Sequence, residues 1–221
     1  MNTKRMGRFA LMIGLSALAG TGLAGTPPLP APAVDIPASS VKGPQTAVFA
    51  GGCFWGVEAV FRHVKGVDRA VSGYAGGMVV KPSYEQVGSG KTGHAESVEV
   101  TYDPAQVSYG QLLAVFFSVA HDPTQKDRQG PDYGTQYRSA IFYVNDDQRR
   151  VAEAYIAQLD QAKAFRGPIV TQVAKLPAFW PAEDYHQNYL AQHPMQPYIV
   201  INDLPKLAAL QKEWPQLYTK R

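Results

Sequence analysis

The sequence has 221 residues, with 21 lysine and arginine residues against 18 aspartate and glutamate residues, and a single cysteine. This length suits one globular domain with extensions. The lone cysteine excludes an intramolecular disulfide framework and cysteine-rich zinc or iron–sulfur sites. Lys4, Arg5 and Arg8 account for the whole positive excess. The rest of the chain is therefore neutral and lacks the charge pattern of a nucleic-acid-binding protein.

Residues 1–24 have the layout of a secretory signal peptide. The three basic residues precede an apolar stretch at 9–23, and Gly22-Leu23-Ala24 places small residues at a cleavage site. The stretch is shorter than the roughly 20 residues that a membrane-spanning helix needs. We therefore expect cleavage and export to the periplasm. The alternative is a chain that keeps this segment as a membrane anchor.

Residues 25–45 are rich in proline and contain no aromatic side chain. Such a composition buries too little surface to fold alone and predicts an extended linker. The remaining residues, 46–221, are expected to form one catalytic domain.

Hydrophobic periodicity predicts the elements of this domain. Ser108 and Gln111 form a capping box at the start of the second helix, and Asn145 caps the third. The predicted strands are 46–51, 67–74, 96–102, 139–144 and 169–175. The predicted helices are 53–63, 108–119, 145–162 and 204–213, with long polar loops at 82–93 and 121–138.

The order of these elements from 46 to 144 is β-α-β-β-α-β. This is the order of the ferredoxin-like fold. We expect an α+β protein whose core is a ferredoxin-like α/β sandwich. An additional helix, a strand and a coil-rich C-terminal segment follow this core.

Cys53 lies between a predicted strand and a predicted helix, after Gly51 and Gly52. The N-terminus of a helix stabilises a thiolate, because its amides are unpaired and its dipole end is positive. This position predicts a lowered thiol pKa and a reactive nucleophile. The alternative is a buried, inert cysteine.

Glu96 shares a face of its alternating strand with Val98, Val100 and Tyr102. A carboxyl group on an apolar face is desolvated, which raises its pKa and suits it to act as a general acid. The alternative is that Glu96 begins the strand and remains in water.

Aromatic residues are numerous around these two positions. An apolar cup next to a nucleophile could hold a small group, and tyrosine hydroxyls could donate hydrogen bonds to a polarised oxygen. Ordinary core packing is the alternative for each of them. The residues are Phe54, Trp55, Tyr84, Tyr133 and Tyr137.

Together these segments resemble the peptide methionine sulfoxide reductase family of the A type. Gly52-Cys53-Phe54-Trp55-Gly56 resembles the active-site motif of that family. Further blocks follow in the family's order over residues 46–203. They are Tyr74-Ala75-Gly76-Gly77, Tyr84, Gly93-His94-Ala95-Glu96, His121-Asp122-Pro123-Thr124, Gln129-Gly130-Pro131-Asp132, Gly134-Thr135-Gln136-Tyr137-Arg138-Ser139 and Pro181-Ala182-Glu183-Asp184-Tyr185-His186-Gln187.

The resemblance implies that Cys53 attacks the sulfur of methionine-S-sulfoxide, free or in proteins, and becomes a sulfenic acid. Phe54 and Trp55 would hold the methyl group of the substrate. Glu96 would protonate the sulfoxide oxygen. Tyr84 and Tyr137 would hydrogen-bond the same oxygen, and Asp132 would support the pocket.

The chain departs from many members of that family because it has no second cysteine to form a disulfide with Cys53. We therefore expect an external thiol, either a thioredoxin-like protein or a small thiol, to reduce the sulfenic acid. No bound cofactor or metal is expected. The expected substrates are oxidised exported proteins, and nothing in the sequence calls for more than a monomer.

Two other functions fit a lone reactive cysteine. A Cys–His acyl-transfer hydrolase would place a histidine, His121 or His186, within hydrogen-bond reach of Cys53. A non-enzymatic domain would bind methionine-rich peptides in the aromatic cup and would retain binding in Cys53→Ser.

Overall fold

The computed structural model describes residues 29–221, and the predicted signal peptide lies outside the described residues. In chain order the elements are β1 (Gln45–Gly51), α1 (Phe54–Arg62), β2 (Val67–Ala75), α2 (Tyr84–Gly88), β3 (Ala95–Tyr102), α3 (Tyr109–Val115), β4 (Arg128–Gln129), β5 (Asp132–Tyr133), β6 (Ser139–Tyr143), α4 (Asp146–Gln161), β7 (Gln172–Lys175), β8 (Phe179–Pro181), α5 (Tyr189–Gln192) and α6 (Leu204–Glu213). The helices formed by the described residues are too short or too polar to span a bilayer.

The central sheet has the strand order β7-β6-β1-β3-β2-β8. Its four middle strands pair antiparallel in the order β6-β1-β3-β2, which is the ferredoxin-like arrangement. β7 extends one edge in parallel with β6, and β8 extends the other antiparallel to β2. The predicted α+β fold with a ferredoxin-like core and additional elements is confirmed.

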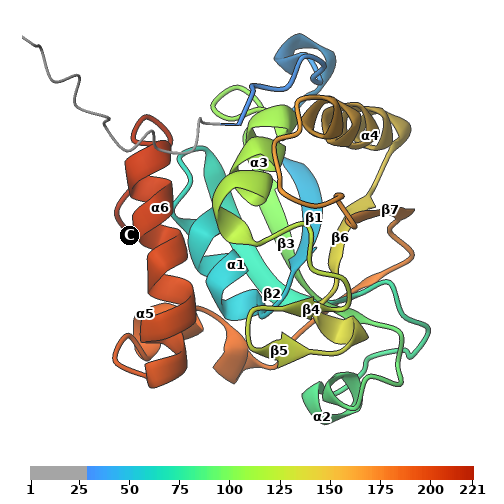
Figure 1. Cartoon of the computed structure of the whole chain (residues 1–221), viewed down its shortest axis with the longest axis vertical. Coiled ribbons are helices and arrows are strands. Elements are labelled where there is room, and N and C mark those ends of the chain that lie inside the picture. Colours follow the sequence, from blue (N-terminus) through green and yellow to red (C-terminus); the bar gives the residue numbers. More distant parts are fainter. Residues whose placement is uncertain (1–28) are drawn as a thin grey trace, which may run out of the picture.

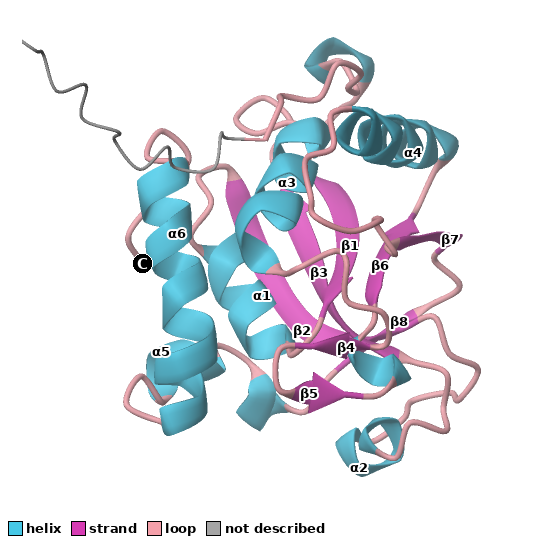
Figure 2. Cartoon of the chain, viewed as in Figure 1, coloured by secondary structure: helices cyan, strands magenta, loops and turns pink. Residues whose placement is uncertain are grey.

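The main core lies between one face of the sheet and the helices. Alternate residues of β1 point into it, such as Ala47 and Phe49, and meet apolar residues of α1, α3 and α4. Figure 2 shows α1 and α3 in front of the sheet, with α6 beside α1. The opposite face carries a smaller cluster that includes Val48 and Ala50.

Two predicted loops contain short elements. The segment 82–93 holds α2, which begins at a capping box between Ser83 and Gln86. The segment 121–138 holds the two-residue strands β4 and β5, which form a separate hairpin. β8 and α5 are further short elements that hydrophobic periodicity did not predict, because they lie in a segment rich in proline and aromatic residues.

The described part of the proline-rich segment lies along the domain. Asp35 accepts hydrogen bonds from the Ser108 hydroxyl and from the Gly110 amide, and Tyr155 donates to the carbonyl of Pro30. Figure 1 shows this segment near α3 and α4. These contacts attach residues 30–35 to the helical layer.

Candidate active site

Cys53 is the N-cap residue of α1, and Gly52 alone separates it from the end of β1. Gly52 makes the turn with φ of +89°, and a Cβ atom there would lie 2.4 Å from the Cβ of Gln129. Glycine is therefore required on both conformational and steric grounds. The turn leaves Cys53 buried, with 8% of its surface exposed.

The surroundings of Cys53 raise the pKa of its thiol, chiefly through burial and then through the nearby carboxyl groups of Glu96 and Asp203. The Trp55 amide and the Lys206 ammonium act in the opposite direction. The expected lowering of the pKa is therefore wrong for this pocket, because desolvation outweighs the helix N-terminus. The protonated form of the thiol is therefore favoured in this pocket.

Glu96 lies on β3 opposite Tyr74 of β2 and is almost fully buried, with 2% of its surface exposed. The amide N–H of Phe54 donates a hydrogen bond of 3.1 Å to its Oε2. Burial, reinforced by Asp132 and Asp203, raises the pKa of Glu96 to about 8. The carboxyl group is thus protonated at neutral pH, as the alternation of the strand predicts for the apolar face.

One pocket of about 190 Å³ brings all seven predicted site residues together. Its lining residues are Cys53, Phe54, Trp55, Tyr84, Glu96, Asp132, Tyr137 and Tyr198. They come from the start of α1, the start of α2, β3, the 121–138 segment and the C-terminal region. Of the five aromatic residues that the sequence suggested for the site, Tyr133 alone is exposed and does not line the pocket.

The pocket tyrosines remain protonated and can donate hydrogen bonds. Burial and the nearby Glu96 raise the pKa of Tyr84 to about 12 and also raise the pKa of Tyr137. Tyr198 donates its hydroxyl to Asp132 Oδ2, so this pair is already occupied. Tyr84 and Tyr137 are therefore the hydroxyl donors available to a ligand oxygen.

Three residues hold the Trp55 indole, a role that the sequence predicted for none of them. Its Nε1 donates a hydrogen bond of 3.1 Å to His186 Nδ1. Its ring stacks on Tyr189 with centroids 3.9 Å apart, and Tyr198 packs edge-on at 6.0 Å. These partners come from the C-terminal region, and they fix the wall of the pocket beside Cys53.

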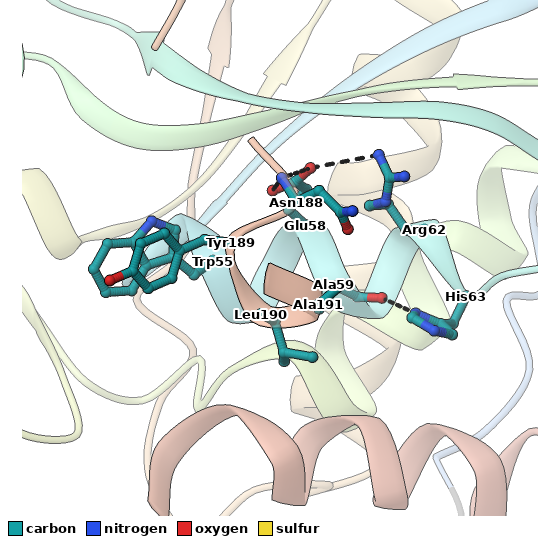
Figure 3. A pocket seen from close by; sticks show the side chains of 9 residues that line it. All are labelled: Trp55, Glu58, Ala59, Arg62, His63, Asn188, Tyr189, Leu190 and Ala191. Carbon is teal, nitrogen blue, oxygen red and sulfur yellow. Dashed lines mark hydrogen bonds and ion pairs between the residues drawn. The ribbon is translucent and has the colours of Figure 1, made fainter. Parts of the chain in front are cut away.

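Glu58, one turn after Trp55 on α1, ties this C-terminal region to the helix. Its buried carboxylate accepts hydrogen bonds from the Asn188 amide at 2.9 and 3.0 Å and from the Ser72 hydroxyl. Arg62 lies 3.7 Å away. Figure 3 shows this cluster next to the Trp55–Tyr189 stack. The crevice between them has a volume of about 10 Å³, which holds at most one water molecule, so it is a packing feature.

Asp203 and Lys206 lie beneath the first turn of α1. Their ion pair of 3.2 Å contains a carboxylate that is 1% exposed, and a Cβ atom on Gly56 would lie 2.1 Å from Asp203 Oδ1. Because Gly56 has no side chain, the Asp203–Lys206 ion pair can pack against α1 close to Cys53.

Neither histidine considered for a hydrolase is bonded to Cys53. His121 contacts the Phe116 carbonyl and the Ser139 hydroxyl through its two ring nitrogens. Burial lowers its pKa to about 4. His186 Nδ1 is occupied by Trp55. The geometry therefore disfavours a Cys–His pair.

The pocket combines a sulfur nucleophile, a protonated carboxyl group, two phenol donors and an apolar aromatic wall. Such a set can accept a small apolar group and protonate an oxygen atom that is bonded next to it. Within residues 29–221, no group of three or more histidine, cysteine, aspartate or glutamate residues is placed to hold a metal ion.

Comparisons with known proteins agree with this chemistry. Residues 45–218 match the family model described as peptide methionine sulfoxide reductase. A peptide methionine sulfoxide reductase MsrA 2 of Mesorhizobium japonicum is 60% identical over 82% of this chain and 93% of its own length. Another of that name, from Synechocystis, is 53% identical over 84% of this chain and 88% of its own length.

Solved structures of the family share the fold. Methionine sulfoxide reductase A of Corynebacterium diphtheriae superposes with a TM-score of 0.62 at 38% identity, covering 71% of this chain and 78% of that one. Reduced Mxr1 of Saccharomyces cerevisiae gives a TM-score of 0.64 at 34% identity, covering 69% of this chain and 87% of that one. The chain belongs to the peptide methionine sulfoxide reductase family of the A type, oxidoreductases that reduce methionine sulfoxide.

Proposed function

We propose that this protein reduces methionine-S-sulfoxide, free or within proteins, with Cys53 as the nucleophile and Glu96 as the acid. The observation that carries the proposal is the pocket itself. It places the only cysteine of the chain beside a carboxyl group whose pKa is about 8. A sulfoxide oxygen leaves poorly until it is protonated, so the reaction needs an acid next to the sulfur nucleophile.

In the proposed step the Cys53 sulfur attacks the sulfoxide sulfur while Glu96 gives its proton to the oxygen. Phe54 and Trp55 hold the methyl group, and Tyr84 and Tyr137 hydrogen-bond the oxygen. The attack forms a sulfur–sulfur bond and leaves a hydroxyl group on the substrate sulfur. The sulfur–sulfur bond and the sulfur–oxygen bond of the substrate then break, and the hydroxyl group passes to Cys53. The thiol proton returns to Glu96, so that the products are methionine and a Cys53 sulfenic acid. Asp132, bonded to Tyr198, supports the pocket.

An external thiol completes the cycle in this proposal, since the chain has no second cysteine. The first thiol attacks the sulfenic acid, releases water and forms a mixed disulfide. A second thiol then frees Cys53. A thioredoxin-like protein or a small thiol fits this role. We further propose that the enzyme is exported and repairs oxidised periplasmic proteins, on the basis of the signal-peptide pattern of residues 1–24. We propose that it acts as a monomer.

A single-turnover experiment tests the chemistry. The pre-reduced protein is mixed with methionine-S-sulfoxide without added thiol, and methionine and intact protein mass are measured. We expect about one methionine per protein and one added oxygen, trapped by dimedone, on Cys53. Cys53→Ser should release none. Turnover by Cys53→Ser, or an unmodified Cys53 after methionine release, would contradict the proposed nucleophile.

Cell fractionation tests the location. A processed chain in the periplasmic fraction agrees with export, whereas a full-length chain in the membrane fraction indicates an anchor and a full-length cytosolic chain contradicts both.

A further inference from the structure

A second and larger hollow lies beside the catalytic pocket. This groove has a volume of about 610 Å³ and is bounded by the loop before α2 and by β8 with the residues that follow it. Its lining residues are Lys81, Pro82, Ser83, Phe179, Trp180, Pro181 and Glu183. None of them has a role in the proposed reaction.

The groove and the catalytic pocket share a thin wall. Ser83, which lines the groove, is the N-cap of α2, and the next residue, Tyr84, lines the catalytic pocket. Glu183 fixes this wall, because its carboxylate accepts the Tyr84 amide at 2.9 Å and the Tyr74 hydroxyl at 2.8 Å. An extended chain advances about 3.3 Å per residue. A segment that leaves the pocket over Tyr84 therefore reaches the groove within a few residues.

The floor of the groove suits an extended, partly apolar chain. β8 pairs with β2 on one side and is the last strand of the sheet in the described part of the chain. An edge strand is a template for an added strand. Phe179 and Trp180 both border the groove, although they pack on opposite faces of the sheet, Phe179 against the smaller cluster and Trp180 against the main core.

Three exposed apolar residues lie close in sequence to residues that line the groove. A single exposed hydrophobic residue is ordinary on a protein surface, whereas several close together often mark a binding site. Met78 and Val80 precede the groove residue Lys81, and Tyr185 lies two residues after Glu183. All three are more than half exposed. Lys81 makes no ion pair with another described residue, so its charge is available to a ligand.

We propose that this groove binds, in extended conformation, the residues that flank the methionine sulfoxide on one side in a polypeptide substrate. It selects an apolar side chain against Phe179 and Trp180, and Lys81 favours an acidic residue at the mouth. This inference rests on the proposed function and specifies its substrates as unfolded polypeptide segments, in which apolar residues are accessible.

The test compares kcat/KM for blocked methionine-S-sulfoxide and for pentapeptides with leucine, serine, aspartate or lysine at each flanking position. We expect leucine to be preferred over serine by about five- to ten-fold at a position on one side of the sulfoxide, as burial of part of a leucine side chain implies. Phe179→Ala should bring this ratio close to one. Phe165→Ala is the matched control, because Phe165, like Phe179, is a half-buried phenylalanine, but it packs against the main core and does not line the groove.

A second variant keeps the test independent of packing. Lys81 is exposed, and Lys81→Glu should reverse a preference for aspartate over lysine, whereas Lys91→Glu should leave it unchanged. The proposed binding of flanking residues in the groove is contradicted if wild-type protein reduces every substrate with equal efficiency. It is also contradicted if the preferences survive both Phe179→Ala and Lys81→Glu. Wild-type protein that reduces none of them refutes the proposed function instead.

Discussion

The role of Glu96 gives the sharpest prediction. Glu96→Gln keeps an oxygen that can accept the Phe54 amide, but it removes the proton that the sulfoxide oxygen needs. With a pKa of about 8, about 90% of Glu96 is protonated at pH 7 and about 10% at pH 9. We expect the reductive step of Glu96→Gln to be slower by ~10²–10⁴, or ~3–5 kcal/mol in activation free energy.

The assay is rapid-mixing single turnover with pre-reduced protein, followed by chromatographic measurement of methionine between pH 6 and 10. The wild-type rate should fall about ten-fold per pH unit above pH 8, as Glu96 loses its proton. The Glu96→Gln rate should lack this fall. Glu99→Gln is the matched control, since Glu99 lies on the same strand but faces away, 3.6 Å from Arg69.

A Glu96→Gln rate within two-fold of wild type at pH 7 would refute the acid assignment, as would a fall above pH 8 that persists in Glu96→Gln.

The pH dependence of protein stability is a second test of the Glu96 protonation state. Because the folded-state pKa of Glu96 is raised, the protonated form favours folding, and stability is lost as pH rises from the ordinary value of about 4.5 through 8. The melting temperature of wild type should therefore drop more between pH 6 and 9 than that of Glu96→Gln.

Three further predictions concern the supports of the pocket. Asp203→Asn removes a negative charge near Cys53 and should shift thiolate absorbance at 240 nm to lower pH; an unchanged or higher midpoint would contradict the electrostatic argument. Glu58→Ala leaves the Asn188 amide without its acceptor and should lower the free energy of unfolding by ~2–4 kcal/mol in urea titration, whereas a loss below ~0.5 kcal/mol would show that the cluster is not needed. Gly56→Ala forces a methyl group against Asp203 and should cost ~1–3 kcal/mol in the same assay, a loss that Gly88→Ala, where no atom lies within 4 Å, should not reproduce.

Much of the fold and of the site could be read from local patterns. The capping box at Ser108 and the alternation of residues 96–102 are short-range features. They predicted α3 and placed Glu96 on the apolar face of its strand, with an exposed position at the start of the strand as the alternative. The Gly-Gly-Cys sequence before an apolar helix likewise placed Cys53 at a helix start. The equivalent capping box at Ser83 predicts α2 by the same rule, although the helix has too few apolar positions to show a period.

The rest depends on contacts between distant parts of the chain. Tyr198 lines the pocket and His186 bonds the pocket residue Trp55, and both come from a segment rich in proline and aromatic residues in which no periodicity indicates a direction. The sign of the Cys53 pKa shift depends on burial and on Asp203, which is 150 positions away in sequence. The position of Cys53 at the start of a helix therefore predicted a lowered thiol pKa, whereas the pocket raises it.

The short helical segment between Tyr198 and α6 links two separate parts of the site. Tyr198 lines the pocket, and Asp203 fits beneath Gly56, with the π-helical turn Ile199–Asp203 between them. A π-turn contains one residue more than an α-turn. Deleting one residue would turn Asp203 by roughly 100° away from Gly56, whereas Val200 and Ile201 face solvent and tolerate exchange. Natural variation in this segment is therefore expected as substitutions and not as insertions or deletions, so its length is more constrained than its composition.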